Sequence, residues 1–262
     1  MEIPIYHIDA FADELFTGNP AAVCPLDNWL HTDLMLSIAG ENNLSETAFF
    51  VPNLDSQGTY ELRWFTPLME VDLCGHATLA CAYVIFKFLV PNLDHIRFET
   101  RSGLVEVVRR DELFFMDLPA FTGLKVKCPN DLFLGLGAMP TEVIKGPNYV
   151  AVFDTERDVI EREPDFEKLS QLHPRGVIIT APGTQYDFVS RFFGPSFGVP
   201  EDPVTGSAHC MLVPFWSEKF KKDNLRGRQI SKRGGDLICE MRGNRVGVGG
   251  NAVLFLRGLI QI

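Results

Sequence analysis

The chain has 262 residues, of which 46% are hydrophobic and 22% charged, enough to bury the core of a globular protein with one or two domains. Acidic residues outnumber basic ones by 34 to 24, so the formal net charge is −10. No block of Lys and Arg is present that could follow a phosphate backbone, and we therefore expect no nucleic-acid partner.

The N-terminus and the apolar runs predict a cytoplasmic protein without a membrane segment. The first residues, MEIPIYH (1–7), lack the basic region and apolar run of a signal peptide and are typical of a strand. The longest apolar stretch (77–90) is interrupted by Lys87 and is shorter than the roughly 20 residues that cross a bilayer.

Cysteine and glycine spacing argues against metals and cofactors. The six cysteines are spread along a chain large enough to need no disulfides, so we expect reduced thiols, mostly in the core. Cys74, His76 and Cys81 do not have the spacing of a tetrahedral zinc site, and no metal is expected. No glycine string matches a dinucleotide or phosphate loop, and no cofactor is expected.

Short strands separated by turns dominate the chain and fall into two sets. The first set is predicted at 3–11, 47–51, 60–65, 96–100, 104–109 and 113–118. A segment rich in Pro and Gly follows to about residue 146, with a short helix at 131–136. The second set is predicted at 149–153, 176–180, 187–193, 229–231, 236–241, 245–248 and 252–256. We therefore predict two domains, 1–119 and 120–262, with the last strand free to return to the first.

Each half also contains one long apolar helix that follows a turn with glycine. The turns are DLCGHATLAC (72–81) and DPVTGSAHC (202–210), and the helices are predicted at 76–88 and 208–220. A helix that is apolar on nearly all sides is enclosed by other elements, and a curled sheet around each would do this. The first N–H groups of a helix lack internal partners, so we expect the two helix starts to face each other and bind a small carboxylate.

Five segments of this sequence resemble the phenazine biosynthesis PhzF-like family, in order and in spacing. They are FTGNPAAV (16–23), NLSETAF (43–49), RWFTP (63–67), LCGHATL (73–79) and EDPVTGSAH (201–209), and RGG (233–235) and VGGNAV (248–253) also fit. The resemblance implies a diaminopimelate-epimerase-like α/β fold, with two similar domains, each a β-barrel-like sheet around a central helix. It places the active site in the cleft between the domains.

The resemblance also implies an isomerase in which Glu46 is the general acid/base, assisted by His76 and Asp202. A carboxyl group in an apolar cleft has a raised pKa and can both take and give a proton. From the residues alone, Glu46 could instead be a surface glutamate, His76 a helix-start histidine bonded to backbone, and Asp202 a cap.

The remaining candidates are substrate-binding residues, and one of them carries an alternative chemistry. They are Asn19, Cys74, Gly75, Thr205, Gly206 and Ser207. Related racemases use two opposed thiols, and here Cys74 matches the first position while Thr205 occupies the second. Two-thiol racemisation is therefore not expected. The alternative is a dehydratase-like enzyme in which the helix start lowers the pKa of Cys74. Cys74 could also be a small, partly buried residue without a chemical role.

We thus predict a cofactor-independent isomerase that moves a proton on a small carboxylate substrate. A non-catalytic protein-binding member of the family is the other alternative. The expected partners are the substrate and, as one option, a second copy of the chain in a homodimer.

Overall fold

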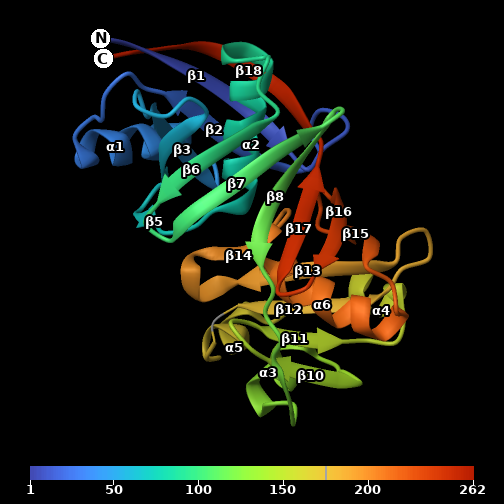
Figure 1. Ribbon diagram of the computed structural model, residues 1–262. Coiled ribbons are helices and arrows are strands. Elements are labelled where there is room, and N and C mark those ends of the chain that lie inside the picture. The colour runs from blue at the N-terminus through green and yellow to red at the C-terminus, as the bar shows by residue number, and fades with distance from the viewer. Residues whose placement is uncertain (175) are drawn as a thin grey trace. The chain divides into compact units, whose positions relative to one another are not determined.

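The computed structural model describes residues 1–174 and 176–262, which form two compact units (Figure 1). Unit 1 comprises Met1–Asp117 and Gly249–Ile262, and unit 2 comprises Leu118–Val248. Among the described residues, no helix is long and apolar enough to cross a membrane.

Unit 1 is a curled sheet with one helix enclosed and one outside. Its elements are β1 (Glu2–Ala10), β2 (Asn19–Pro25), α1 (Thr32–Asn42), β3 (Glu46–Pro52), β4 (Thr59–Phe65), β5 (Glu70–Val71), α2 (Gly75–Val84), the π-helical turn η1 (Ile85–Leu89), β6 (His95–Thr100), β7 (Gly103–Arg110), β8 (Leu113–Pro119) and β18 (Ala252–Gln261). Strand pairing gives the order β18-β1-β2-β3-β4-β6-β7-β8, in which β2/β3 and β4/β6 are the parallel pairs. A parallel pair needs a crossover, which α1 supplies between β2 and β3 and α2 between β4 and β6.

Strand alternation sends the side chains of β3 to two different helices. Phe49 packs outward in one cluster with Met35 and Ile38 of α1. Phe50, one residue on, points to the opposite face and contacts the ring of Tyr60. On that inner side α2 packs against β1, β2, β3 and β18. Every residue of α2 except Tyr83 is buried, which confirms the prediction of an enclosed helix.

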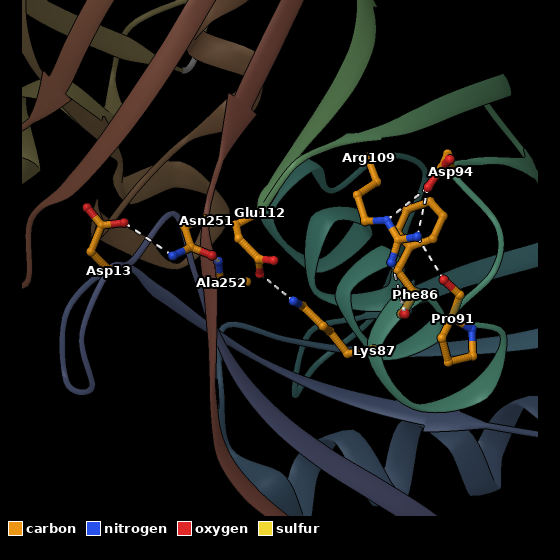
Figure 2. Close-up of polar contacts among 9 residues, drawn as sticks. All are labelled: Asp13, Phe86, Lys87, Pro91, Asp94, Arg109, Glu112, Asn251 and Ala252. Atoms are coloured by element: carbon orange, nitrogen blue, oxygen red, sulfur yellow. Dashed lines mark hydrogen bonds and ion pairs between the residues drawn. The ribbon is translucent and has the colours of Figure 1, made fainter.

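Arg109 of β7 fixes the segment that follows α2 (Figure 2). Its guanidinium donates to the carbonyl oxygens of Phe86 and Pro91 at 3.4 and 2.7 Å, and to Asp94 Oδ1 at 2.7 Å. Phe86 lies in the π-helical turn and Pro91 follows it, so these bonds tie the segment that leaves the helix to β7. Helix α2 carries the functional motif at its start, and a side chain of the surrounding sheet thus holds the segment at its other end.

Unit 2 repeats the plan of unit 1. Its elements are β9 (Leu124–Val126), α3 (Asn130–Leu136), β10 (Glu142–Lys145), β11 (Tyr149–Val152), α4 (Glu156–Ile160), α5 (Phe166–Ser170), β12 (Val177–Pro182), β13 (Phe188–Gly194), η2 (Pro195–Phe197), β14 (Val199–Asp202), the 3-10 turn η3 (Gly206–Ala208), α6 (His209–Phe220), β15 (Asn224–Gln229), β16 (Gly235–Arg242) and β17 (Arg245–Gly250). The pairing order is β9-β10-β11-β12-β13-β15-β16, with β11/β12 and β13/β15 parallel. Helices α4 and α5 supply the first crossover and α6 the second.

Several elements differ from the sequence prediction, which did not include β2, β9, β10, β14, α4 and α5. Helix α1 was not predicted, although His31 accepts a hydrogen bond at its start and Asn43 ends it in the left-handed conformation, φ 48°. The strand predicted at 229–231 lies at Asn224–Gln229 instead. Its last residue, Gln229, uses its side chain to bind a neighbouring turn, and the strand ends there.

Candidate functional site

Three elements of unit 1 bring Asn19, Glu46 and His76 together. Strands β2 and β3 are parallel, with Ala21 opposite Glu46. Ala22 and Cys24 pack on the α1 side, so alternation turns Asn19 and Ala21 inward, as it does Glu46. Both polar side chains therefore point toward the start of α2, where His76 is the second residue.

The tight turn before β2 requires glycine. Gly18 has φ +66°, and a Cβ atom there would lie 2.2 Å from the carbonyl oxygen of Ala10. A side chain could not be accommodated without moving backbone. The Gly-Asn pair of the motif thus places Asn19 at the first position of the strand.

The imidazole of His76 is held from both ring nitrogens. Nε2 lies 3.1 Å from Glu46 Oε2, and Nδ1 lies 3.1 Å from Asn19 Nδ2. Cys74 Sγ lies 3.5 Å from Nδ1 and 4.0 Å from Nε2. Since the terminal amide of Asn19 can present nitrogen or, after a 180° rotation, oxygen, it can serve a neutral or a protonated ring.

The three side chains in contact here are almost entirely buried. His76 is 4% exposed and Asn19 is fully buried, while the Glu46 side chain retains 15% exposure. Burial by itself lowers the pKa of an imidazole, but the adjacent Cys74 and Glu46 raise the pKa of His76 well above its usual value. The Cys74 thiol is neutral near pH 7, so we attribute the rise to Glu46. His76 and Glu46 therefore form an ion pair with one solvent-accessible edge.

The structure corrects the expectation that the helix start lowers the pKa of Cys74. Burial and the negative charge of Glu46 raise the pKa of this thiol to about 11. Cys74 is the N-cap of α2 and is only 7% exposed, so desolvation outweighs the helix dipole. Its side chain is a neutral thiol at physiological pH.

The second motif forms a clamped turn in unit 2. Asp202 ends β14, and its carboxylate accepts a hydrogen bond from the Thr205 hydroxyl. The buried amide of Gln229 accepts from the Thr205 backbone N–H at 2.8 Å and donates to the Asp202 carbonyl at 2.6 Å. Gly206 is buried and Ser207 exposed in the 3-10 turn η3 that precedes α6.

The predicted site residues therefore form two groups. Asn19, Glu46, Cys74 and His76 lie together in unit 1, with Gly75 beginning α2 beside them. Asp202, Thr205, Gly206 and Ser207 lie together in unit 2. The facing arrangement of the two helix starts concerns two separate units and stays a prediction.

Sequence reasoning missed two features of this region. Gln229 clamps the second motif, and only its position at the end of a short polar strand segment could have indicated this. Donor atoms of Glu46, Cys74 and His76 lie within 4.8 Å of one another, but Cys74 Sγ lies on the Nδ1 side of the ring and Glu46 on the Nε2 side, so they do not converge on one ion. The spacing argument against zinc did not include Glu46, which is distant in sequence.

The chain is similar to known proteins over nearly its whole length. Residues 8–258 match the family model described as phenazine biosynthesis-like protein. The chain belongs to this family. A Pseudomonas aeruginosa protein named as an uncharacterized isomerase is 48% identical, over all of both chains. The crystal structure of a phenazine biosynthesis PhzF-family protein from Enterococcus faecalis is 42% identical, covers all of both chains and superimposes with a TM-score of 0.96. Membership of the PhzF-like family, expected from the motifs, is confirmed.

A more distant likeness extends the fold beyond the PhzF-like family. The crystal structure of a hydroxyproline epimerase from Agrobacterium vitis has a TM-score of 0.65 at 13% identity, over 99% of this chain and 92% of that one. At that identity the likeness shows the fold alone. The predicted epimerase-like α/β fold is thereby confirmed.

Proposed function

We propose that this chain is a cofactor-independent isomerase that moves a proton on a small carboxylate substrate, with Glu46 as the general acid/base. The observation that carries the proposal is the Glu46–His76 pair, whose Oε2 and Nε2 atoms lie 3.1 Å apart. Related proteins of the family are named as isomerases, which agrees with this chemistry.

The reaction needs one group that can accept a proton from carbon and return it. The Glu46 carboxylate takes the proton as the C–H bond breaks, the electron pair moves into a shifted double bond, and the proton is delivered to another carbon. No net oxidation occurs, and no co-reactant is consumed. The proton cycles on one carboxyl group that is shielded from bulk water but has an accessible edge.

His76 acts beside this carboxylate. Its raised pKa favours the imidazolium, which donates a hydrogen bond to Glu46 or to a developing negative charge on the substrate. The first N–H groups of α2, beginning at Gly75, are suited to a substrate carboxylate because the N-cap Cys74 makes no side-chain cap hydrogen bond. We propose Asp202 as a further polar contact to the substrate, with Thr205, Gly206 and Ser207 contributing from the same turn.

The Cys74-dependent alternative rests on the thiol lying 3.5 Å from His76 Nδ1. A thiol with a pKa of about 11 is a poor source of thiolate at neutral pH, which argues against it. A non-catalytic binding protein would have no need of a buried ion pair at an accessible edge, because such a pair costs desolvation energy.

The proposal is tested by incubating small carboxylates with the enzyme in deuterated water and following deuterium on carbon by mass spectrometry. Incorporation by wild-type protein and its loss in Glu46→Gln would support the assignment. Incorporation that survives in Glu46→Gln but not in Cys74→Ser would favour the thiol alternative. If the wild-type protein incorporates deuterium into none of the carboxylates, the result favours a non-catalytic binding protein.

A further inference from the structure

The end of unit 1 at which η1 terminates contains a pocket of about 640 Å³. Its walls are mainly apolar and aromatic, and they include Trp29, Phe50, Tyr60, Leu89 and Val90. Leu89 is the last residue of η1, so this wall lies on the order of 20 Å along the helix from the start of α2. A concave apolar pocket with a few polar groups is typical of a small-molecule site. This one is separate from the Glu46–His76 pair.

Tyr60 presents an unused hydrogen-bonding group to this pocket. The residue is 6% exposed and forms part of the lining. Within residues 1–174 and 176–262, no group bonds to its hydroxyl, although that hydroxyl is not sealed in the core. Burial raises the pKa of Tyr60, so the hydroxyl stays protonated and can both donate and accept. A polar ligand atom in the pocket would supply the missing partner.

The aromatic walls are held in place by contacts of their own. Trp29 Nε1 donates to Glu61 Oε2 at 2.7 Å, and the Arg63 guanidinium lies 5.3 Å from the centre of the indole. The ring of Tyr60 packs edge-on against Phe50 with 5.5 Å between the ring centres. Because these side chains are already ordered, a ligand that binds between them loses little affinity to side-chain ordering.

The charged groups of the lining favour a cation. Glu2 and Asp27 contribute two carboxylates, against the single ammonium group of Met1, which bonds to the Ile262 carbonyl. Glu2 accepts a hydrogen bond from Gln261, whereas no group in the described part of the chain pairs with Asp27. The described lining includes no Lys, Arg or His. A ligand with an apolar body and a positive charge therefore matches the pocket better than an anion does.

We propose that this pocket binds a small aryl-ammonium ion. Its ring lies against Trp29 and Tyr60, and its ammonium group bonds to the Tyr60 hydroxyl within the field of the Asp27 carboxylate. Ammonium groups are attracted to the faces of aromatic rings, and the apolar ring of the ligand displaces water from the aliphatic wall. The proposal does not depend on the isomerase activity, because neither Glu46 nor His76 lines the pocket.

Binding is measured by calorimetry, with phenethylammonium chloride as the probe and phenylacetate as the matched anion. For a probe of this size we expect a Kd of roughly 1 mM or below, which rises with added salt, and at least about tenfold weaker binding of phenylacetate. Tyr60→Phe removes only the hydroxyl and should weaken probe binding about tenfold. Asp27→Asn should weaken it about two- to fivefold, because Asp27 is exposed.

Tyr83→Phe and Asp154→Asn are the matched controls, because neither residue lines the pocket and Asp154 is an exposed residue of unit 2. Both should bind the probe as the wild type does. Glu46→Gln should also bind it normally, and this variant tests whether the probe occupies the catalytic carboxylate instead.

Three results would each overturn the proposal: no binding to the wild type, equal binding of phenylacetate, or undiminished affinity in Tyr60→Phe with a native circular dichroism spectrum. Loss of binding in Glu46→Gln together with full affinity in Asp27→Asn would assign the probe to the catalytic site and overturn it as well. Absence of deuterium exchange on any carboxylate would count only against the proposed function.

Discussion

Glu46 and Phe49 lie three residues apart on β3 and face opposite sides of the sheet. Phe49 packs against α1, whereas the Glu46 carboxylate lies 3.1 Å from His76 Nε2 of α2. The period of two along a strand produces this separation. A one-residue slip of β3 would exchange the two faces and place the acid/base against the apolar side of α1.

Removing the ionisable carboxyl group should abolish proton exchange. Glu46→Gln keeps the shape of the side chain but cannot cycle a proton, so we expect a loss of about 10²–10⁴-fold in the rate of deuterium incorporation. Ligand binding measured by calorimetry should change by only a small factor. Glu61→Gln, on the neighbouring strand β4, is the control and should retain the wild-type rate. A rate near wild type in Glu46→Gln would refute the role.

Replacing Asn19 should loosen the imidazole without removing any proton donor or acceptor of the proposed chemistry. Asn19→Ala deletes the amide at 3.1 Å from His76 Nδ1, and the loss of one buried hydrogen bond is expected to cost about tenfold in rate. Asn19→Asp adds a second negative charge beside the ring and should move the basic limb of the pH–rate profile upward. An unchanged profile in Asn19→Asp would show that Asn19 does not act through His76. Exposed Asn28→Ala serves as the control.

The Cys74 thiol should alkylate slowly and only at high pH. Its pKa is raised to about 11, because burial and Glu46 disfavour the thiolate. In a Cys128→Ser background, iodoacetamide modification of Cys74, followed by mass spectrometry, should accelerate only above the ~8.5 of a free cysteine. A midpoint below that value would indicate an activated thiol and favour the alternative chemistry.

His209 should make stability depend on pH between 6.5 and 4. This residue of α6 is fully buried, its Nδ1 bonds the Thr205 carbonyl at 3.0 Å, and burial lowers its pKa to about 4. In this window the unfolded state binds a proton that the folded state excludes, so stability is complete above pH 6.5 and declines as the pH falls toward 4. The loss amounts to on the order of 3 kcal/mol.

Urea unfolding at several pH values checks this dependence. His209→Gln removes the titration, so its free energy of unfolding should fall less steeply between pH 6.5 and 4, whatever its absolute stability. Exposed His31→Gln should keep the wild-type slope. Equal slopes in His209→Gln and the wild type would contradict the prediction.

Gln229 should be required for the stability of the Asp202–Thr205 turn. Gln229→Ala leaves the buried Thr205 N–H without its acceptor at 2.8 Å, which is expected to cost about 1–3 kcal/mol. Chemical denaturation monitored by far-ultraviolet circular dichroism measures the change, with exposed Gln57→Ala as the control. Equal midpoints for Gln229→Ala and the wild type would show that the clamp carries little energy.

Local signals alone determined much of the molecule. The apolar composition of 76–88 predicted an enclosed helix, and α2 is enclosed, ending in a π-helical turn. The five motifs, from FTGNPAAV (16–23) to EDPVTGSAH (201–209), indicated the family, and the family model confirms it. By contrast, α1 contains Gly40, and its apolar and polar residues do not follow a clear helical period. The face that it buries is therefore evident only from its packing on the sheet.

Tertiary structure alone decided how the site residues meet. Asn19 and His76 are 57 residues apart, and their contact depends on the register of β2 and β3 around α2, which no local pattern encodes. Burial likewise reversed the expectation for Cys74, since the helix start favours a thiolate while the enclosed position disfavours it more strongly. The sequence by itself determined which residue types stand at each element's end. Only the packing of those elements decided their distances, their solvent access and hence their charge, because desolvation and ion pairing depend on neighbours far away in the chain.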